Sequence, residues 1–391
     1  MSALNSPALS KAGQRAIIVR ALLALIMLAP VTMLFVQVWQ TESTNTRSAS
    51  MELDAIAYLR VLQPVLTTLA QNESLVVSQE QVVFNAMDQA MSAAGQADAK
   101  YGDELRTHER WNGFATKANA LPALGNASPI DSFNAYSAVT DLLLSLYDKV
   151  RDESGLVRDP DADVFYLEDA ATHALPNAVS AAGQYGDSIV VEFGPASGIA
   201  AARVNVSTDR ALLDLNADDV GDDVSDAVDA TASRSMSSTL LHKVDLFRQA
   251  IETLAPTRLA PVTTPSDSDE SAALQNKAET EAAAASLSSA LLDAIETLVT
   301  DRGAAARHKQ DLSLAAFVVA ILIVALLITA EIRRGLFRRT KKRPVADRPD
   351  ASNAPEPDDL VVIGAHAAPR DPRRDFVFTG RDEQGRSGVP Q

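Results

Sequence analysis

Residues 16–38 read AIIVRALLALIMLAPVTMLFVQV, an apolar run whose single charge, Arg20, lies near its start. A second run, LSLAAFVVAILIVALLITAEI at residues 312–332, has only Glu331 near its end. A helix rises about 1.5 Å per residue, so about 20 residues cross the roughly 30 Å hydrocarbon core of a bilayer. The two runs therefore predict two transmembrane helices.

Each run has a simpler alternative. The first could be a cleaved signal peptide, but its apolar core is longer than a usual signal core. The nearest small-x-small site, Ser48-x-Ser50, also lies too far downstream. The second could be a buried core helix, which its length without an interior charge disfavours. We expect an uncleaved anchor and a second span.

The basic residues around the two runs predict their orientation. Cytoplasmic flanks of membrane spans have an excess of Lys and Arg. We therefore expect residues 1–15 and 333–391 in the cytoplasm and residues 39–311 on the other side of the membrane. The basic residues behind this prediction are Lys11, Arg15, Arg20, Arg333, Arg334, Arg338, Arg339, Lys341, Lys342 and Arg343.

The predicted outer domain is strongly acidic. The 391-residue chain has a net charge of −16, and residues 40–311 alone hold 41 acidic against 19 basic side chains. Such a surface repels nucleic acid, which excludes DNA or RNA as a partner. The chain has no cysteine, so packing alone must hold the domain together, without disulfides or Cys-ligated metals.

Apolar residues of the predicted outer domain recur every three or four positions. This period is typical of amphipathic helices, and no run alternates apolar and polar residues as a strand does. We expect an all-α domain of about six substantial helices, forming one elongated bundle or two bundles stacked end to end. The clearest repeats are Ile56, Leu59, Leu62, Leu66 and Leu69, and Leu287, Leu291, Ile295 and Leu298.

Two stretches resemble a known family. One lies within residues 51–64 and the other is SGLVRDPDADVFYLEDA at residues 154–170. The second is similar to the S-N-L-x-x-D-P-D-x-D-S-Y-Y-L-M-D segment of two-span bacterial chemoreceptors and sensor kinases. The resemblance implies an all-helical extracytoplasmic sensor region of the helical bimodular kind. The matching residues of the first stretch are Met51, Glu52, Tyr58, Leu59, Arg60 and Pro64.

The chain also departs from that family. Asn72-Glu73 stand where the family often has His-Arg, so a carboxylate-binding role of that arginine would be lost. Gly155 and Phe165 replace the Asn and the first Tyr of the motif. The second span is followed by a polar, proline-punctuated tail rather than an output module.

The carboxylates of residues 159–163 begin a predicted helix. Asp159 suits the N-cap and Pro160 the first turn, so capping with a favourable dipole interaction is the simplest explanation. The resemblance implies instead that Asp163 and Tyr166 join helices at a junction between bundles. A calcium loop is excluded, because its sixth and twelfth positions lack the required Gly and Glu.

A few arginines of the acidic domain are candidates for ligand binding. Arg106, Arg110 and Trp111 fall within two turns of one predicted helix, and Arg60 is another cation. A guanidinium group pairs with a carboxylate through two hydrogen bonds, so these residues could clamp a small anionic ligand. Surface salt bridges with neighbouring glutamates are the alternative.

Seven aspartates form an acidic strip on another predicted helix. Spacings of four place several of them on one face, where like charges repel. A divalent cation would relieve this repulsion, but we expect a solvated face. The residues are Asp214, Asp218, Asp219, Asp222, Asp223, Asp226 and Asp229.

No catalytic machinery is predicted. The five histidines show no metal-ligand spacing, and the chain has no phosphate-binding glycine loop, nucleophile elbow or kinase signature. We expect no enzyme activity, no cofactor and no metal ion. Two functions stay open: a membrane sensor that binds a small molecule or protein, and an envelope structural or accessory protein. We expect membrane lipid and further copies of the chain as partners.

The predicted cytoplasmic tail, residues 345–391, has the composition of a disordered segment. Two short apolar islands at residues 360–363 and 376–378 have strand propensity. They are either chance hydrophobic residues or docking strands for the sheet edge of another protein. Docking would link a sensor without an output module to a separate cytoplasmic signalling partner.

Overall fold

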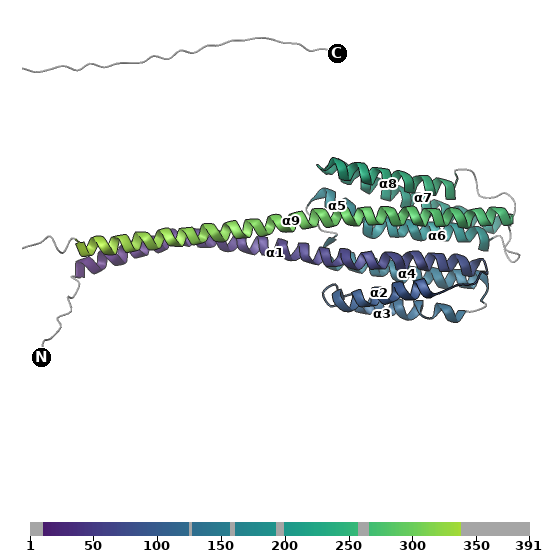
Figure 1. Ribbon diagram of the computed structural model, residues 1–391, viewed down its shortest axis with the longest axis horizontal. Coiled ribbons are helices and arrows are strands. Elements are labelled where there is room, and N and C mark those ends of the chain that lie inside the picture. Colours follow the sequence, from purple (N-terminus) through teal and green to yellow (C-terminus); the bar gives the residue numbers. More distant parts are fainter. Residues whose placement is uncertain (1–10, 125–126, 157–160, 193–198, 257–265, 338–391) are drawn as a thin grey trace, which may run out of the picture. The chain divides into compact units, whose positions relative to one another are not determined.

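Every described element of the chain is a helix, as the apolar periodicity predicts. The computed structural model describes residues 11–124, 127–156, 161–192, 199–256 and 266–337, and no strand occurs among them. The elements are α1 (Lys11–Val77), α2 (Asn85–Tyr101), α3 (His108–Ala118), η1 (Leu121–Leu124), α4 (Pro129–Ser154), α5 (Ala162–Asp169), η3 (Ala170–Ala174), α6 (Leu175–Val191), α7 (Ile199–Ala230), α8 (Arg234–Leu254) and α9 (Asp267–Phe337), shown in Figure 1.

A helical bundle forms the core of the unit that ends at Arg333. α1 packs against α2, α4 and α6, and α4 also packs against α3 and α6. α7 packs against α5, α6 and α8. α9 completes the core with Leu287, Leu291 and Ile295, which are buried. The apolar stripes of α1 and α9 therefore lie on the inner faces of their helices.

The helices lie side by side rather than in two bundles stacked end to end. Ser74 of α1, Asp187 of α6 and Lys277 of α9 are hydrogen-bonded to one another. The adjacent Glu73 of α1 accepts a hydrogen bond from Ser137 of α4. Helices α1, α4, α6 and α9 therefore meet at one level of the same bundle.

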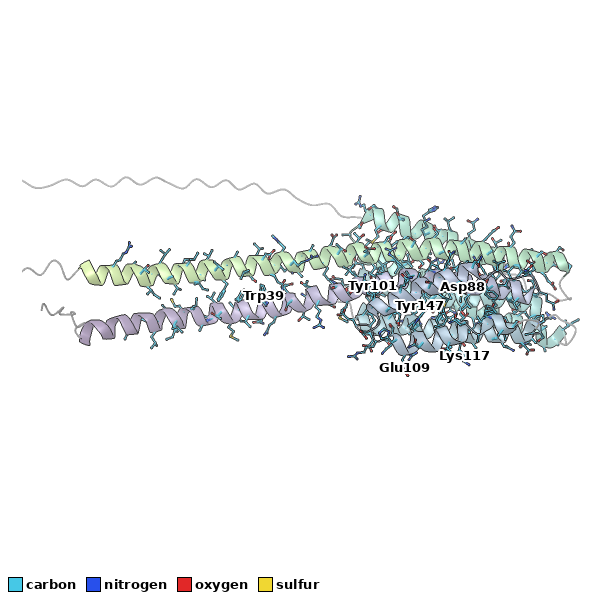
Figure 2. The ribbon with its side chains drawn as sticks, turned by 60° about the horizontal axis from the view of Figure 1, so that its bottom comes forward. Trp39, Asp88, Tyr101, Glu109, Lys117 and Tyr147 are labelled. Carbon is cyan, nitrogen blue, oxygen red and sulfur yellow. The ribbon has the colours of Figure 1, made fainter. Side chains whose placement is uncertain are left out.

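Helices α1 and α9 extend beyond the bundle as an antiparallel pair (Figures 1 and 2). Each contains a segment long and apolar enough to cross a membrane, within Leu22–Val77 and Ser268–Ala330, and the side chains of these segments are exposed. Trp39, labelled in Figure 2, lies on this extension of α1. Phe35 stacks on Phe317 with ring centroids 4.3 Å apart, so the two helices stay in contact there. These features are compatible with a membrane protein.

Between the apolar segments and the Lys277 level, polar contacts and one close approach join α1 to α9. Arg302 of α9 pairs with Glu52 of α1, which also accepts a hydrogen bond from Ser48 at 3.0 Å. A Cβ placed on Gly303 would lie 3.3 Å from the Cβ of Ala49. The absence of a side chain at Gly303 thus lets the two helices approach closely.

The helix that runs from α5 to α6 contains one π turn, η3. Pro176 has no N–H, so it cannot donate to the carbonyl of Thr172 as a helical residue normally does. The N–H of Leu175 bonds instead to the carbonyl of Ala170, five residues earlier. The chain stays helical from Ala162 to Val191, so the helix continues past the proline with a changed winding.

Candidate functional site

Arg60, one of the predicted ligand-binding residues, joins α1 to α9. Its guanidinium group donates hydrogen bonds to Asp293 at 2.6 Å and to Glu296 at 2.7 Å. The carboxylates of both partners are more than half exposed, so water screens these ion pairs. The contacts correspond to surface salt bridges, the alternative to a ligand clamp.

Arg106 and Arg110 also have partners within the chain. Arg106 lies before α3 in the left-handed region, with a φ of 50°, so it does not share a helix with Arg110 as predicted. Its guanidinium pairs with Glu153 at 3.4 Å. Arg110 bonds the hydroxyl of Ser145, and Trp111 packs against the core. The predicted anion clamp thus gains no support from these contacts.

The junction motif is described in part, because Asp159 and Pro160 lie outside the described residues. Asp163 accepts a hydrogen bond at 3.0 Å from the next backbone N–H, so it stabilises the start of its own helix. Tyr166 is half-buried and packs against the core from α5, which contacts α7. Its packing agrees with a structural role for Tyr166.

The acidic strip lies on α7 and faces mainly solvent. Asp218, Asp222 and Asp226 are exposed, as expected for a solvated face. Asp223 is only half-exposed, and its burial together with the charges of nearby aspartates raises its pKa to about 7. Within the described part of the chain, no group of three or more His, Asp or Glu could hold a metal ion.

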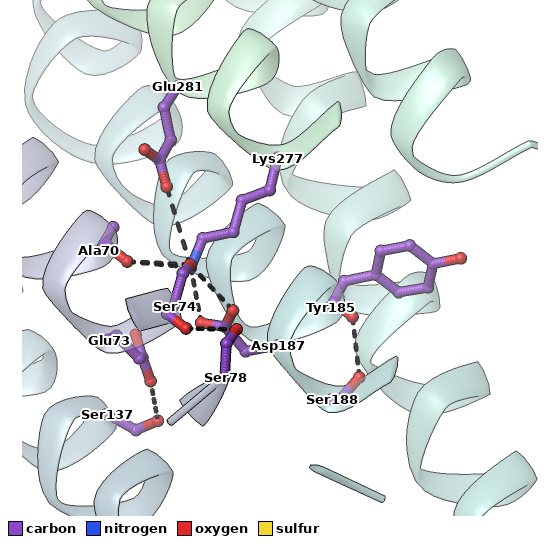
Figure 3. A network of polar contacts seen from close by, with 10 residues as sticks. All are labelled: Ala70, Glu73, Ser74, Ser78, Ser137, Tyr185, Asp187, Ser188, Lys277 and Glu281. Carbon is purple, nitrogen blue, oxygen red and sulfur yellow. Dashed lines mark hydrogen bonds and ion pairs between the residues drawn. The ribbon is translucent and has the colours of Figure 1, made fainter. Parts of the chain in front are cut away.

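Lys277 is the most deeply buried cation among the described residues of the bundle (Figure 3). Its ammonium group donates to the carboxylate of Asp187 at 2.6 Å, the hydroxyl of Ser74 at 2.5 Å and the carbonyl of Ala70 at 3.0 Å. An ammonium group has three N–H donors, so each of them has an acceptor. Lys277 thereby fastens α9 to both α1 and α6.

Two glycines of α6 make room for the stem of Lys277. A Cβ on Gly186 would lie 3.1 Å from Cδ of Lys277, closer than ordinary van der Waals contact. A Cβ on Gly183 would lie 3.7 Å from its Cε. Asp187 directly follows Gly186, so a short G-x-x-G-D stretch both accommodates the lysine side chain and binds its charge.

Two more carboxyl groups, of Glu73 and Glu281, lie near Lys277, and each has few hydrogen bonds or none. Glu73 of α1 is buried and accepts a bond of 3.4 Å from Ser137. Glu281 lies one turn after Lys277, with a carboxylate oxygen 3.9 Å from the ammonium nitrogen. Neither oxygen of Glu281 has a hydrogen-bond partner within the described part of the chain. We call Glu73, Asp187, Lys277 and Glu281 the Lys277 cluster; it holds three carboxyl groups and one ammonium group.

Burial and this charge imbalance shift the pKa values of the cluster. Burial, with the charge of Asp187 nearby, raises the pKa of Glu73 to about 8. Burial also raises the pKa of Glu281 to about 7, although the charge of Lys277 opposes the shift. Burial alone would lower the pKa of Lys277, but the surrounding carboxylates raise it. Near neutral pH, Lys277 is therefore charged and Glu281 is close to its titration midpoint.

A surface pocket of about 350 Å³ lies beside the Lys277 cluster. Residues of α1 and α9 line it, together with Ser78 and Glu80, which follow α1. Small-molecule sites have volumes in about this range. Its polar lining includes Ser74, Ser78, Glu80, Gln275, Lys277 and Glu281. A molecule that enters this pocket from solvent would therefore lie next to Lys277 and Glu281.

The Lys277 cluster was not among the predicted site residues, although the apolar repeats of the sequence could have indicated it. Glu73 follows Leu69 by four positions, so it continues the apolar stripe of α1. Lys277 precedes Leu287 by ten residues, close to three helical turns, so it lies on the corresponding stripe of α9. A charge in the register of a core stripe is buried once the bundle forms, which marks it as unusual.

The resemblance to two-span sensors stays a prediction, carried by its two motif stretches. The Lys277 cluster and its pocket are the candidate functional site. No protein-family model, curated protein or solved structure matches the chain.

Proposed function

We propose that this protein is a membrane-anchored sensor. Its helical domain lies outside the cytoplasm and responds to a small molecule at the Lys277 cluster. Helices α1 and α9 pass the response through the membrane to a separate cytoplasmic partner. One observation supports this proposal above the others: the two helices that contain the apolar segments, α1 and α9, also contact each other at Lys277.

The continuity of α1 and α9 supports transmission over a long distance. Neither helix is interrupted between the cluster and its apolar segment. At about 1.5 Å per residue, the stretch of α9 from Lys277 to Phe317 is about 60 Å long. Small sliding or rotation of packed helices is a known means of signalling. A shift of α9 relative to α1 at Lys277 would therefore reach the stacked Phe35 and Phe317.

The charges of the cluster suit a site whose helix contacts change when a ligand or proton binds. In a buried site of low polarity, adding or removing one charge changes the interactions of all neighbouring polar groups. Here those groups belong to α1, α6 and α9. A ligand or proton that alters the charge of Glu281 would therefore strengthen or weaken the hydrogen bonds from Lys277 to α1.

The resemblance to two-span bacterial sensors suggests the bacterial inner membrane, and the charge around the apolar segments suggests the orientation. We place the protein in the bacterial inner membrane, with both termini in the cytoplasm and residues 39–311 outside. Exposed apolar side chains on both extensions support contact with lipid.

Cysteine crosslinking in native membranes tests the transmission. The chain has no cysteine, so a pair introduced by Ala49→Cys and Gly303→Cys would be the only thiols. Their Cβ positions, 3.3 Å apart, are close to the separation found in disulfides. We expect Lys277→Met to change the rate of disulfide formation by about threefold or more. Lys117→Met removes an exposed lysine from α3 and serves as the control.

The outcome separates the two functions left open by the sequence. A changed rate in a Lys277→Met protein that stays folded, as checked by circular dichroism, and an unchanged rate with Lys117→Met support a sensor. Equal rates in all three proteins would mean that the cluster does not communicate with the membrane-proximal helices. That result would favour the structural or accessory role.

A further inference from the structure

We propose that the pocket beside Glu281 binds a small protonated amine, with Glu281 as its counter-charge. The proposal rests on the proposed sensor function and names the ligand class of its site. Two observations carry it: the pocket of about 350 Å³ lined by residues of α1 and α9, and Glu281 among those residues, whose buried carboxylate oxygens have no hydrogen-bond partner in the described part of the chain.

Lys277 is poorly placed to bind an anion, although it lines the same pocket. Its three donors already have acceptors in Asp187, Ser74 and Ala70. An anionic ligand would have to break one of these buried bonds, which costs free energy. It would also approach the carboxylates of Glu80 and Glu281, which line the pocket. The charges around the pocket therefore disfavour the anionic ligand suggested by the sequence.

None of the described residues donates a hydrogen bond to the carboxylate of Glu281. Its side chain is 2% exposed, and its nearest cation, the ammonium group of Lys277, is 3.9 Å away. Leaving a buried charged group without hydrogen bonds is costly, so a donor that reaches it gains free energy. A primary ammonium group brings both the missing charge and three N–H donors.

Other groups in the pocket suit the same ligand. Glu80 is exposed and adds a second negative charge at the pocket, while Ser78 and Gln275 offer neutral acceptors. The apolar side chains of Leu75 and Leu274 also line the pocket and can cover a short carbon chain. The pocket therefore combines acceptors, negative charge and a limited apolar surface.

Amine binding would alter the cluster that joins the helices. An amine that pairs with Glu281 competes with Lys277 for the same carboxylate. Lys277 then interacts more strongly with Asp187 of α6 and with α1. Ligand binding and the contact between α9 and its neighbours are thus coupled through one carboxylate.

Calorimetric titration of the full chain in lipid nanodiscs tests the proposal. The probes are putrescine, ethanolamine and, as an anion of similar size, succinate. At about pH 8, above the pKa of Glu281, we expect saturable binding of at least one amine and none of succinate. Glu281→Gln should weaken amine binding by about tenfold or more, because it removes a charge-assisted hydrogen bond.

Two more variants complete the test. Glu80→Gln should weaken binding less, because that carboxylate is exposed. Glu109→Gln removes the same charge from the exposed face of α3 and should leave binding unchanged. The folding of each variant is checked by circular dichroism, and we expect Glu281→Gln to fold because an amide of the same size replaces an unbonded carboxylate.

Several outcomes would overturn the proposal. They are no binding of either amine, equal affinities for the chain with and without Glu281→Gln, or binding of succinate in place of the amines. Each leaves the crosslinking result unaffected, because that experiment uses no ligand. The sensor function can therefore survive a wrong ligand class, and a bound amine can occur in a protein that does not signal.

Discussion

Lys277 of α9 and Asp187 of α6 form an ion pair of 2.6 Å whose side chains are 1% and 0% exposed. Removing two charges from water costs several kcal/mol per ion, and their attraction offsets this only when the remaining donors and acceptors are also satisfied. Ser74 and Ala70 supply those further bonds to Lys277. We infer that the pair fixes how α6 and α9 fit together more than it adds to stability.

Removing one partner of the Lys277–Asp187 pair should therefore lower the free energy of unfolding more than replacing both partners with apolar residues. We expect Lys277→Met to lower the free energy of unfolding by about 3–5 kcal/mol, because it leaves a buried carboxylate without its cation. The double variant Lys277→Met/Asp187→Leu should recover at least half of the loss. Chemical denaturation of the full chain in detergent micelles, followed by circular dichroism, measures both. A double variant as unstable as the sum of its single variants would contradict this account.

The glycine next to Asp187 allows a second, independent check of the same packing. Gly186→Ala places a Cβ 3.1 Å from Lys277, and such overpacking typically costs about 1–3 kcal/mol. Gly113→Ala is the matched control, because a Cβ there meets nothing within 4 Å on exposed α3. The control should be more stable by about 0.5–1 kcal/mol, as alanine is the better helix former. Equal denaturation midpoints for both variants would mean that Lys277 adjusts without cost.

The helical fold could be predicted where large apolar residues mark one face. Leu62, Leu66 and Leu69 gave a clear period for α1, and the corresponding leucines did so for α9. Helix α2 was not predicted, because it buries mainly small residues such as Ala90 and Ala94, which contrast little with their neighbours. A stripe of alanines packs well but leaves a weak pattern in the sequence.

The site depends on contacts that no local pattern specifies. Lys277 bonds Asp187, 90 positions away, and Ala70, 207 positions away. Only the way in which α1, α6 and α9 pack brings these residues together. The sequence favours the arginines as ligand-binding candidates because cations are rare in the acidic domain, yet Arg60 is paired with carboxylates of α9. The scarcity of basic residues in the sequence does not show which of them is buried and which forms a surface ion pair.

The two raised carboxyl pKa values predict how stability depends on pH. Folding raises the pKa of Glu73 to about 8 and that of Glu281 to about 7, both from 4.5. The folded protein thus holds protons that the unfolded chain releases. Their contribution to stability is complete below about pH 4.5 and is lost as the pH rises through 7 and 8. We expect the denaturation midpoint to fall between about pH 5 and pH 9.

Replacement by glutamine identifies the groups behind that fall. Glu73→Gln and Glu281→Gln should each flatten the profile, because an amide does not titrate in this range. Part of the slope should remain, since the pKa of Asp223 is about 7 and the hydrogen bond with Asp98 raises the pKa of His108. An unchanged profile in the Glu73→Gln/Glu281→Gln double variant would show that neither carboxyl group keeps a proton on folding.

The orientation of the two apolar segments can be tested by reporter fusions. Alkaline phosphatase needs disulfides and is active only outside the cytoplasm. A fusion after Ala200, within the proposed outer domain, should be active, and a fusion after Pro344 should be inactive. The expectation follows from the excess of Lys and Arg before the first segment and after the second. A reporter that is active only in the cytoplasm should give the opposite pattern. If alkaline phosphatase were active after Pro344 and inactive after Ala200, the bundle and its pocket would face the cytoplasm, and an external ligand would have no access to Glu281.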